Sequence, residues 1–166
     1  MLEVKYKALS GYAEWFWLIA KNWKDVENRN WSLPYEISMN LPYRIYLHAS
    51  KKPASEEEID FIARQLSEAQ YADFCNVNWN KLRGHIIGET TIVNQMVKQQ
   101  YTEADHVDMG SQQIELELLR KANSAYLSTW FFGKFGFVVK DGILYDEPIP
   151  CKGMLGFFKP IINSWQ

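Results

Sequence analysis

The chain opens with an alternation of apolar and polar residues. Val4, Tyr6 and Ala8 alternate with Lys5 and Lys7, the period of two expected for a strand with one solvated face. Stretches rich in β-forming residues predict strands at residues 43–49 and 85–97. Residues 26–31 can run extended, and a final strand is expected near residues 154–159. Both alternating sets of residues 85–97 are apolar, so we expect that strand to be buried on both faces.

Helical spacing replaces this alternation between residues 12 and 21. The apolar residues that recur on one helical face are Tyr12, Trp15, Phe16 and Ile19. Trp17 and Leu18 make the remaining surface apolar too, which predicts a helix that is buried widely or that meets a partner. Asn22 follows, and Asn tolerates the left-handed conformation that ends many helices.

A second helix is predicted from residue 55 onward. Ser55 and Glu58 form the S-x-x-E pattern of a capping box, and apolar residues then follow at helical spacing to about Tyr71. Further along, Asp141-Gly142 separates two apolar stretches and predicts a two-residue hairpin. Residues 98–123 are more polar and predict an insert with a short helix at residues 112–121.

Composition supports one folded domain, and the mixture of predicted strands and helices makes it α+β. Of the 166 residues, 47% are apolar and 15% aromatic, which is enough to build a core, and no linker or repeat divides the chain. We therefore expect a single domain over residues 1–166, with an insert at about 98–123. The net charge is −2, so any nucleic-acid site has to be a local patch.

Several other classes of protein are disfavoured. Cys75 and Cys151 lie far apart, without zinc-finger spacing or a disulfide framework, which favours reduced thiols and a cytoplasmic location. No apolar run approaches the roughly 18 residues of a transmembrane helix, and residues 1–10 lack the apolar stretch of a signal peptide. Residues 105–108 (DHVD) are weak evidence for a metal, and no phosphate-binding glycine loop is present, so we predict no metal and no cofactor.

Charged and aromatic groups concentrate between residues 24 and 31. If this segment is extended, Glu27, Arg29 and Trp31 point to one face, because side chains alternate along a strand. Arg29 can then hold a phosphate or carboxylate with its planar guanidinium, while Glu27 orients Lys24 or an amino group of a substrate. The alternative is a structural ion pair between Glu27 and Arg29.

The same segment carries a family resemblance. Residues 22–29 (NWKDVENR) match the motif G-x-K-x-x-E-x-R at Lys24, Glu27 and Arg29, with Asn22 in place of Gly. Similar segments occur at residues 8–10, 15, 31, 44–53, 84–88, 130–133 and 148–153. The chain therefore resembles the ASCH domain family of the PUA-like group, in the version found in activating signal cointegrator.

The resemblance implies a fold and a function. The implied fold is a small PUA-like mixed or antiparallel β-barrel with helices packed around it, and with a cleft beside the helix that ends near Asn22. ASCH-like proteins are linked to RNA or DNA binding, and some bacterial members resemble hydrolases that deacylate a modified cytidine or cut RNA. In the amidohydrolase branch Thr occupies the position of Glu27, so that mechanism does not transfer to this chain.

The predicted ligand-binding residues combine cations, a carboxylate and flat rings: Lys24, Glu27, Arg29, Trp31, Trp15, Ser10, His48, Lys51, Lys52 and Trp130. Indole rings stack on bases, and lysines neutralise phosphates. Arg44 and His48 are expected to join Lys51 and Lys52 in a phosphate-facing patch. Core packing of the tryptophans, solvated lysines and a structural histidine remain the alternatives.

Three functions are consistent with these residues. The first is a nucleic-acid-binding module for RNA or single-stranded nucleic acid, which uses the cleft that carries the K-x-x-E-x-R motif. The second is a hydrolase for a modified nucleoside, such as an acylated cytidine, or for RNA, with Lys24 and Glu27 as the catalytic pair. The third is a protein-interaction module that uses the apolar helix at residues 12–21 and the insert.

Overall fold

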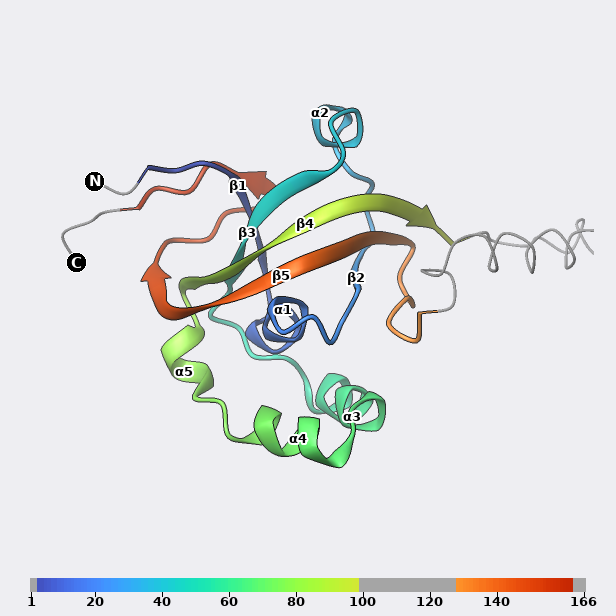
Figure 1. Cartoon of the computed structure of the whole chain (residues 1–166), viewed down its shortest axis with the longest axis vertical. Coiled ribbons are helices and arrows are strands. Elements are labelled where there is room, and N and C mark those ends of the chain that lie inside the picture. Colours follow the sequence, from blue (N-terminus) through green and yellow to red (C-terminus); the bar gives the residue numbers. More distant parts are fainter. Residues whose placement is uncertain (1–2, 99–127, 163–166) are drawn as a thin grey trace, which may run out of the picture. The chain divides into compact units, whose positions relative to one another are not determined.

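The computed structural model describes residues 3–98 and 128–162. The predicted helix at residues 112–121 and the DHVD segment lie outside them. In chain order the elements are β1 (Lys7–Gly11), α1 (Ala13–Ala20), β2 (Val26–Arg29), α2 (Tyr35–Ser38), β3 (Tyr43–Ala49), α3 (Glu56–Gln65), α4 (Glu68–Cys75), α5 (Trp79–Leu82), β4 (His85–Val97), β5 (Phe135–Pro150) and β6 (Phe157–Phe158) (Figure 1).

The strands form one mixed sheet in the order β2-β5-β4-β3-β1-β6. β1 runs parallel to β3 and antiparallel to β6, whereas β2 is antiparallel to β5. A mixed sheet accompanied by helices is an α+β fold, so the predicted fold class is confirmed. The bounds of β3 and β4 coincide with the predicted strands, and the short β6 lies inside the predicted final strand.

The described chain divides into two compact units that alternate in sequence. The first unit comprises Met1–Lys24, Arg44–Thr91 and Lys140–Gln166, and the second comprises Asp25–Tyr43 and Ile92–Val139. Strands β3, β4 and β5 contribute residues to both units. The single domain expected over residues 1–166 stays a prediction.

In the first unit, α1 is buried on almost every side. Its buried residues are Ala13, Glu14, Phe16, Trp17, Leu18, Ile19 and Ala20. The ring of Trp17 meets the rings of Trp23, Phe74 and Trp79 edge-on, with centroids 5.1, 6.0 and 5.9 Å away. This packing explains why the helix is apolar all round, because the core takes up both of its apolar surfaces.

The helix predicted to run from Ser55 to about Tyr71 is two helices. The Ser55–Glu58 capping box is present at the start of α3, as predicted. A second capping box follows, in which Ser67 accepts from the backbone of Gln70 and the Gln70 side chain accepts from the backbone of Ser67. This second box begins α4, so apolar spacing alone overestimated the length of the first helix.

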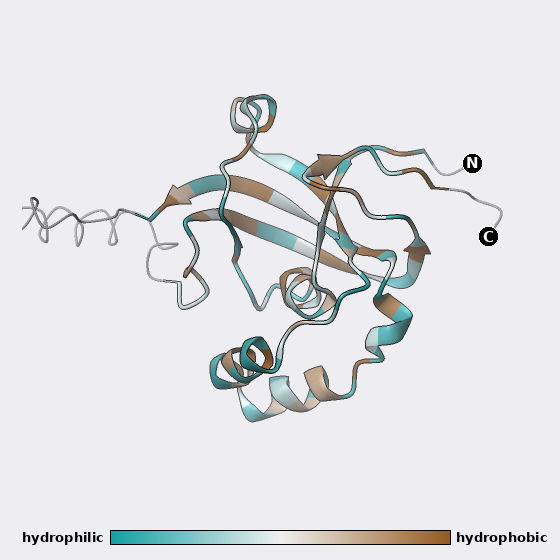
Figure 2. Ribbon diagram, turned by 180° about the vertical axis from the view of Figure 1, so that it is seen from behind, coloured by the Kyte–Doolittle hydropathy of each residue, from teal (hydrophilic) through white to brown (hydrophobic). Residues whose placement is uncertain are grey.

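Burial along β4 changes partway through the strand. Hydrophobic and hydrophilic bands alternate along the long strands (Figure 2). Ile86, Ile87 and Gly88 are buried in succession, which agrees with a strand covered on both faces. From Glu89 to Val93 partly buried and buried residues alternate, and Asn94 is exposed, so the prediction of burial on both faces holds only for the start of β4.

The hairpin predicted at Asp141-Gly142 is wrong, because β5 runs unbroken through both residues (Figure 1). Asp141 does have the positive φ that suggested a turn, at 55°. A positive φ inside a strand marks a local irregularity, such as the one found at a β-bulge. Gly142 allows close approach of α1, since a Cβ on it would lie 2.3 Å from the carbonyl oxygen of Ile19.

Asn22 joins the end of α1 to this irregularity. It has a φ of 61°, which confirms the predicted left-handed conformation. Its Nδ2 donates to the carbonyl of Gly142 at 2.9 Å, and its Oδ1 accepts from the amide of Gly142 at 2.6 Å. Asn at this position therefore supplies both the conformation that Gly would give and two hydrogen bonds that Gly cannot make.

We predict that Asn22→Gly lowers the free energy of unfolding by about 1 kcal/mol, because two hydrogen bonds are lost while the backbone conformation stays easy. Asn22→Ala should lose about 2 kcal/mol, because Ala also disfavours a positive φ. Urea denaturation of the three proteins measures both values. A glycine variant as stable as the parent would show that the Asn22 side chain contributes nothing.

Candidate functional site

In the second unit, strand β2 places Glu27 and Arg29 on one face. Arg29 Nε lies 3.3 Å from Glu27 Oε1, and both side chains are largely shielded from solvent. The pairing of β2 with β5 sets Glu27 opposite Phe137 and Arg29 opposite Phe135. The ion pair considered as an alternative is therefore present, and it fixes the direction in which the guanidinium points.

Trp31 extends this row beyond the end of the strand. The Cζ atom of Arg29 lies 5.6 Å from the centroid of the Trp31 ring, a cation–π distance. The Trp31 ring in turn meets the buried ring of Phe137 at 5.6 Å and 66°. The predicted common face of Glu27, Arg29 and Trp31 is thus present in the structure, as a carboxylate, a cation and an indole in sequence.

In the first unit, Lys24 forms a similar pair with Trp15. The Lys24 side chain is buried, at 3% exposure, and its Nζ lies 5.1 Å from the centroid of the Trp15 ring. Trp15 Nε1 donates to Glu58 Oε1 at 3.1 Å, and the ring also contacts Phe61. A cation over a fixed indole therefore occurs in both units. The cleft that was expected to join Lys24 to Glu27 stays a prediction.

Ser10 and His48 form a closed hydrogen-bonded chain in the first unit. His48 Nε2 lies 2.6 Å from the carbonyl of Cys151, which can only accept, so this nitrogen carries the proton. His48 Nδ1 is then the acceptor for the Ser10 hydroxyl at 2.8 Å. A Cβ on Gly153 would lie 2.7 Å from His48 Cε1, so the backbone of Gly153 covers the pair closely. Packing accounts for this arrangement, and a ligand-binding role for Ser10 and His48 stays a prediction.

Burial sets the protonation of His48. It is 2% exposed, and desolvation lowers its pKa, helped weakly by the charge of His85 and opposed by the hydrogen bond to Cys151. The imidazole is therefore held neutral near pH 7, in the state that the hydrogen bonds require.

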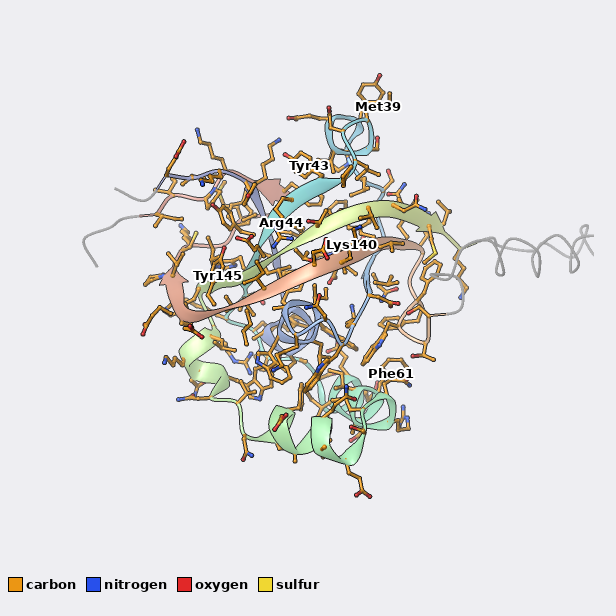
Figure 3. All side chains as sticks on the ribbon, viewed as in Figure 1. Met39, Tyr43, Arg44, Phe61, Lys140 and Tyr145 are labelled. Atoms are coloured by element: carbon orange, nitrogen blue, oxygen red, sulfur yellow. The ribbon has the colours of Figure 1, made fainter. Side chains whose placement is uncertain are left out.

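Arg44 does not join Lys51 and Lys52 in the expected phosphate-facing patch. Its Nε and Nη2 donate to Glu89 Oε1 at 2.9 and 2.8 Å, and its Nη1 donates to Thr91 and to the carbonyl of Asp141. Glu89 also accepts from the hydroxyl of Tyr145. Arg44 and Tyr145 are labelled in Figure 3. Arg44 is used to connect β3, β4 and β5, whereas Lys51 and Lys52 are exposed.

Tyr145 completes this network as a neutral phenol. Burial raises its pKa, and the hydrogen bond to the Glu89 carboxylate raises it further. The network therefore contains one ion pair, between Arg44 and Glu89, and a neutral phenol. We interpret it as a structural connection across the sheet.

Trp130 is buried at 7% exposure, which favours core packing over base stacking for this residue. The structure also identifies two residues that the sequence analysis missed. Asn28 Nδ2 donates to the carbonyl of Trp130, and Glu58 holds the indole of Trp15. Asn28 stood at an unspecified motif position and Glu58 was explained by its capping box, so neither carried a separate signal.

The protein-interaction hypothesis loses part of its support. Trp17 is buried, whereas Trp15 and Trp23 are partly exposed, and most of α1 belongs to the core. Within residues 3–98 and 128–162, no group of His, Cys, Asp and Glu is arranged to hold a metal ion. In the same residues no helix has the length and apolar character needed to cross a membrane.

Comparison with known proteins gives matches among solved structures. No family model and no curated protein sequence matches the chain. An ASCH protein of Zymomonas mobilis is 16% identical, over 89% of this chain and 72% of its own, with a TM-score of 0.39. Two single-residue variants of that protein are 17% and 15% identical, over 95% and 98% of this chain and 76% and 77% of theirs, each with a TM-score of 0.38. The structures bear the name of the family that residues 22–29 resemble.

We predict that acid destabilises the protein through His48. Its folded pKa is lowered, so the unfolded chain takes up the proton first, and stability present above about pH 6.5 is lost as the pH falls toward the folded pKa. The free energy of unfolding, measured in urea across this pH range, should therefore decline on acidification. His48→Gln should flatten the decline and His85→Gln should leave most of it. An unchanged slope in His48→Gln would contradict this account.

Proposed function

We propose that this protein binds RNA or single-stranded nucleic acid through the row of Glu27, Arg29 and Trp31. The observation that carries the proposal is the Arg29 guanidinium 5.6 Å from the Trp31 ring and paired with Glu27. A guanidinium binds a phosphate through its planar set of donors, and an indole offers a face to a base. A cation and an indole side by side match the alternation of phosphate and base along a single strand.

Glu27 gives this row its selectivity. A carboxylate accepts hydrogen bonds from the amino groups of bases, and it repels phosphates that approach without the cation. The ion pair with Arg29 also limits the conformations of both side chains, which lowers the entropic cost of ordering them when a ligand binds. The net charge of −2 means that affinity comes from such local groups and not from a general attraction.

Lys24 and Trp15 belong to the same proposal. They provide a second cation–indole pair, two residues before β2 begins, with the ring held by Glu58 and Phe61. The exposed lysines Lys51 and Lys52 are proposed as outer phosphate contacts.

We predict that Arg29→Ala weakens binding of a labelled single-stranded oligonucleotide by about tenfold or more at low salt, since one charge-assisted phosphate contact is lost. The slope of log affinity against log salt concentration should fall by about 0.7, the value for one phosphate of a single strand. Fluorescence anisotropy titrations at several salt concentrations measure both effects.

Two variants control this experiment. Arg29→Lys keeps the charge without the planar fork, so it should recover the salt slope but only part of the affinity. Arg64→Ala removes an exposed arginine of α3 and should leave binding unchanged. Equal affinities for the parent protein and Arg29→Ala, or no binding by the parent protein at low salt, would refute the proposed role of the row.

A hydrolase for a modified nucleoside is the second candidate, and the burial of Lys24 favours it. Burial of an amine against an indole supports this candidate, because a base or nucleophilic lysine is activated by desolvation. Glu27 is the proposed proton-transfer partner.

We predict, for this second candidate, that the protein hydrolyses an acylated cytidine or a short RNA and that Lys24→Met abolishes turnover. Methionine preserves the packed side-chain volume, so the variant should remain folded. Chromatographic detection of the products checks the activity, and circular dichroism checks the fold. Unchanged substrates after prolonged incubation with the parent protein would leave binding as the function.

A further inference from the structure

Asn28 fastens a loop against the face of β2 opposite Glu27 and Arg29. Its Nδ2 donates to the carbonyl of Trp130 at 2.7 Å, while its Oδ1 accepts from the amides of Phe132 and Gly133 at 3.0 and 2.9 Å. One side chain therefore satisfies three backbone groups of residues 130–133. A loop held in this way has one conformation, which a loop without such bonds would not keep.

Two glycines let this loop lie directly on the strands. A Cβ on Gly133 would lie 2.8 Å from the Cβ of Asn28, so a larger residue there would push the loop away. A Cβ on Gly136 would lie 2.9 Å from Val26 and 3.1 Å from the ring of Phe131. The chain thus has small residues at the two points where the loop and the ring of Phe131 approach most closely.

The loop turns one aromatic ring outward. Trp130 is buried, and Phe131 packs over Gly136, so these two rings anchor the loop. Phe132, which follows Phe131 in the loop, is 49% exposed. Exposing a phenyl ring to water costs hydrophobic free energy. This loop is fixed by an asparagine and two glycines with the ring exposed, which indicates a contact surface.

Two exposed lysines lie on the backbone that adjoins this loop. The amide of Lys98, at the end of β4, donates to the carbonyl of Lys134 at 2.8 Å, so the two backbones are adjacent. Lys134 Nζ lies 5.6 Å from the centroid of the Phe135 ring, and both lysines are exposed. An exposed aromatic ring, with exposed cations on the adjoining backbone, offers a base-stacking face and phosphate contacts in one stretch of the surface.

We infer that Phe132 is a base-stacking platform for single-stranded nucleic acid and that Lys98 and Lys134 contact the adjoining phosphates. The inference rests on the proposed function and adds a contact on the second face of β2. Because β2 is the terminal strand of the sheet order, its two faces meet at one edge. A single strand of about 4–16 nucleotides, the site size of small single-strand-binding domains, is long enough to pass round that edge.

The second unit offers a matched control for this site. Tyr35 is a more exposed aromatic residue, at 78%, but its neighbour is the acidic Glu36 and no lysine adjoins it in the described sequence around α2. Exposure alone would make Tyr35 the better platform, whereas the combination of a fixed loop and cations selects Phe132. Comparing variants of the two residues therefore distinguishes a specific site from non-specific binding to any exposed aromatic ring.

We predict that Phe132→Ala weakens binding of a labelled oligouridylate to the full chain by about fivefold to a hundredfold, the range for losing one stacked base. Phe132→Trp keeps a flat ring and should retain or improve the affinity, while Tyr35→Ala should match the parent protein. Anisotropy titrations give the affinities, and thermal melting confirms that each variant is folded.

A photocrosslinking arm tests the contact without a substitution. An oligonucleotide that carries 5-iodouridine should crosslink to Phe132 in the parent protein, as located by mass spectrometry of the peptides. Asn28→Ala should reduce this crosslink although Phe132 is still present, because Asn28 acts as a positioning residue. A crosslink confined to other peptides would overturn the inference.

The outcomes distinguish this inference from the proposed function. If the parent protein binds and Arg29→Ala weakens it, but Phe132→Ala does not, the platform is wrong and the Arg29 site stands. If Phe132→Ala weakens binding and Arg29→Ala does not, the platform stands and the proposed row is wrong. If the parent protein binds no single strand at low salt, both are wrong, and the exposed ring then belongs to a protein contact.

Discussion

The register of β2 against β5 is the constraint on which the second unit depends. It pairs Glu27 with Phe137, Asn28 with Gly136 and Arg29 with Phe135. A slip of one residue would exchange the two faces of the strand, so the carboxylate and guanidinium would move to the loop side and the asparagine to the other. The same register leaves Gly136 beneath the Phe131 ring, where a Cβ would lie 3.1 Å from that ring and force it to shift. One short strand thereby decides both the charged row and the fastening of residues 130–133.

Much of the fold could be predicted because local signals agreed with tertiary packing. β3, β4 and the start of α3 follow from β-forming runs and a capping box, and Asn22 was correctly assigned its left-handed conformation. The errors arose where one local signal has two structural uses. A positive φ at Asp141 suits a turn or an irregularity within a strand, and the sheet partners decide between them. Apolar spacing likewise continued past Ser67, where a second cap begins a new helix.

The candidate site was predictable only in part, because a sequence lists chemical groups without saying which are already engaged. Period-two alternation was enough to bring Glu27 and Arg29 to one face. It could not show that Arg44 donates four hydrogen bonds across the sheet, or that His48 lies under Gly153. The sequence also contained no sign of the role of Asn28, because this role depends on carbonyl and amide groups more than 100 positions away.

The pair of Lys24 with Trp15 and the pair of Arg29 with Trp31 share a design that would let a chain with net negative charge present the proposed nucleic-acid site. In each pair the ring is held by a further group: Glu58 holds Trp15, and Phe137 supports Trp31. A ring that is already fixed loses little conformational freedom when a base stacks on it, so more of the contact energy appears as affinity. Preorganised rings can therefore supply binding that a basic surface would otherwise have to supply. Such binding depends less on salt than a basic face does, because fewer phosphates are neutralised for the same affinity.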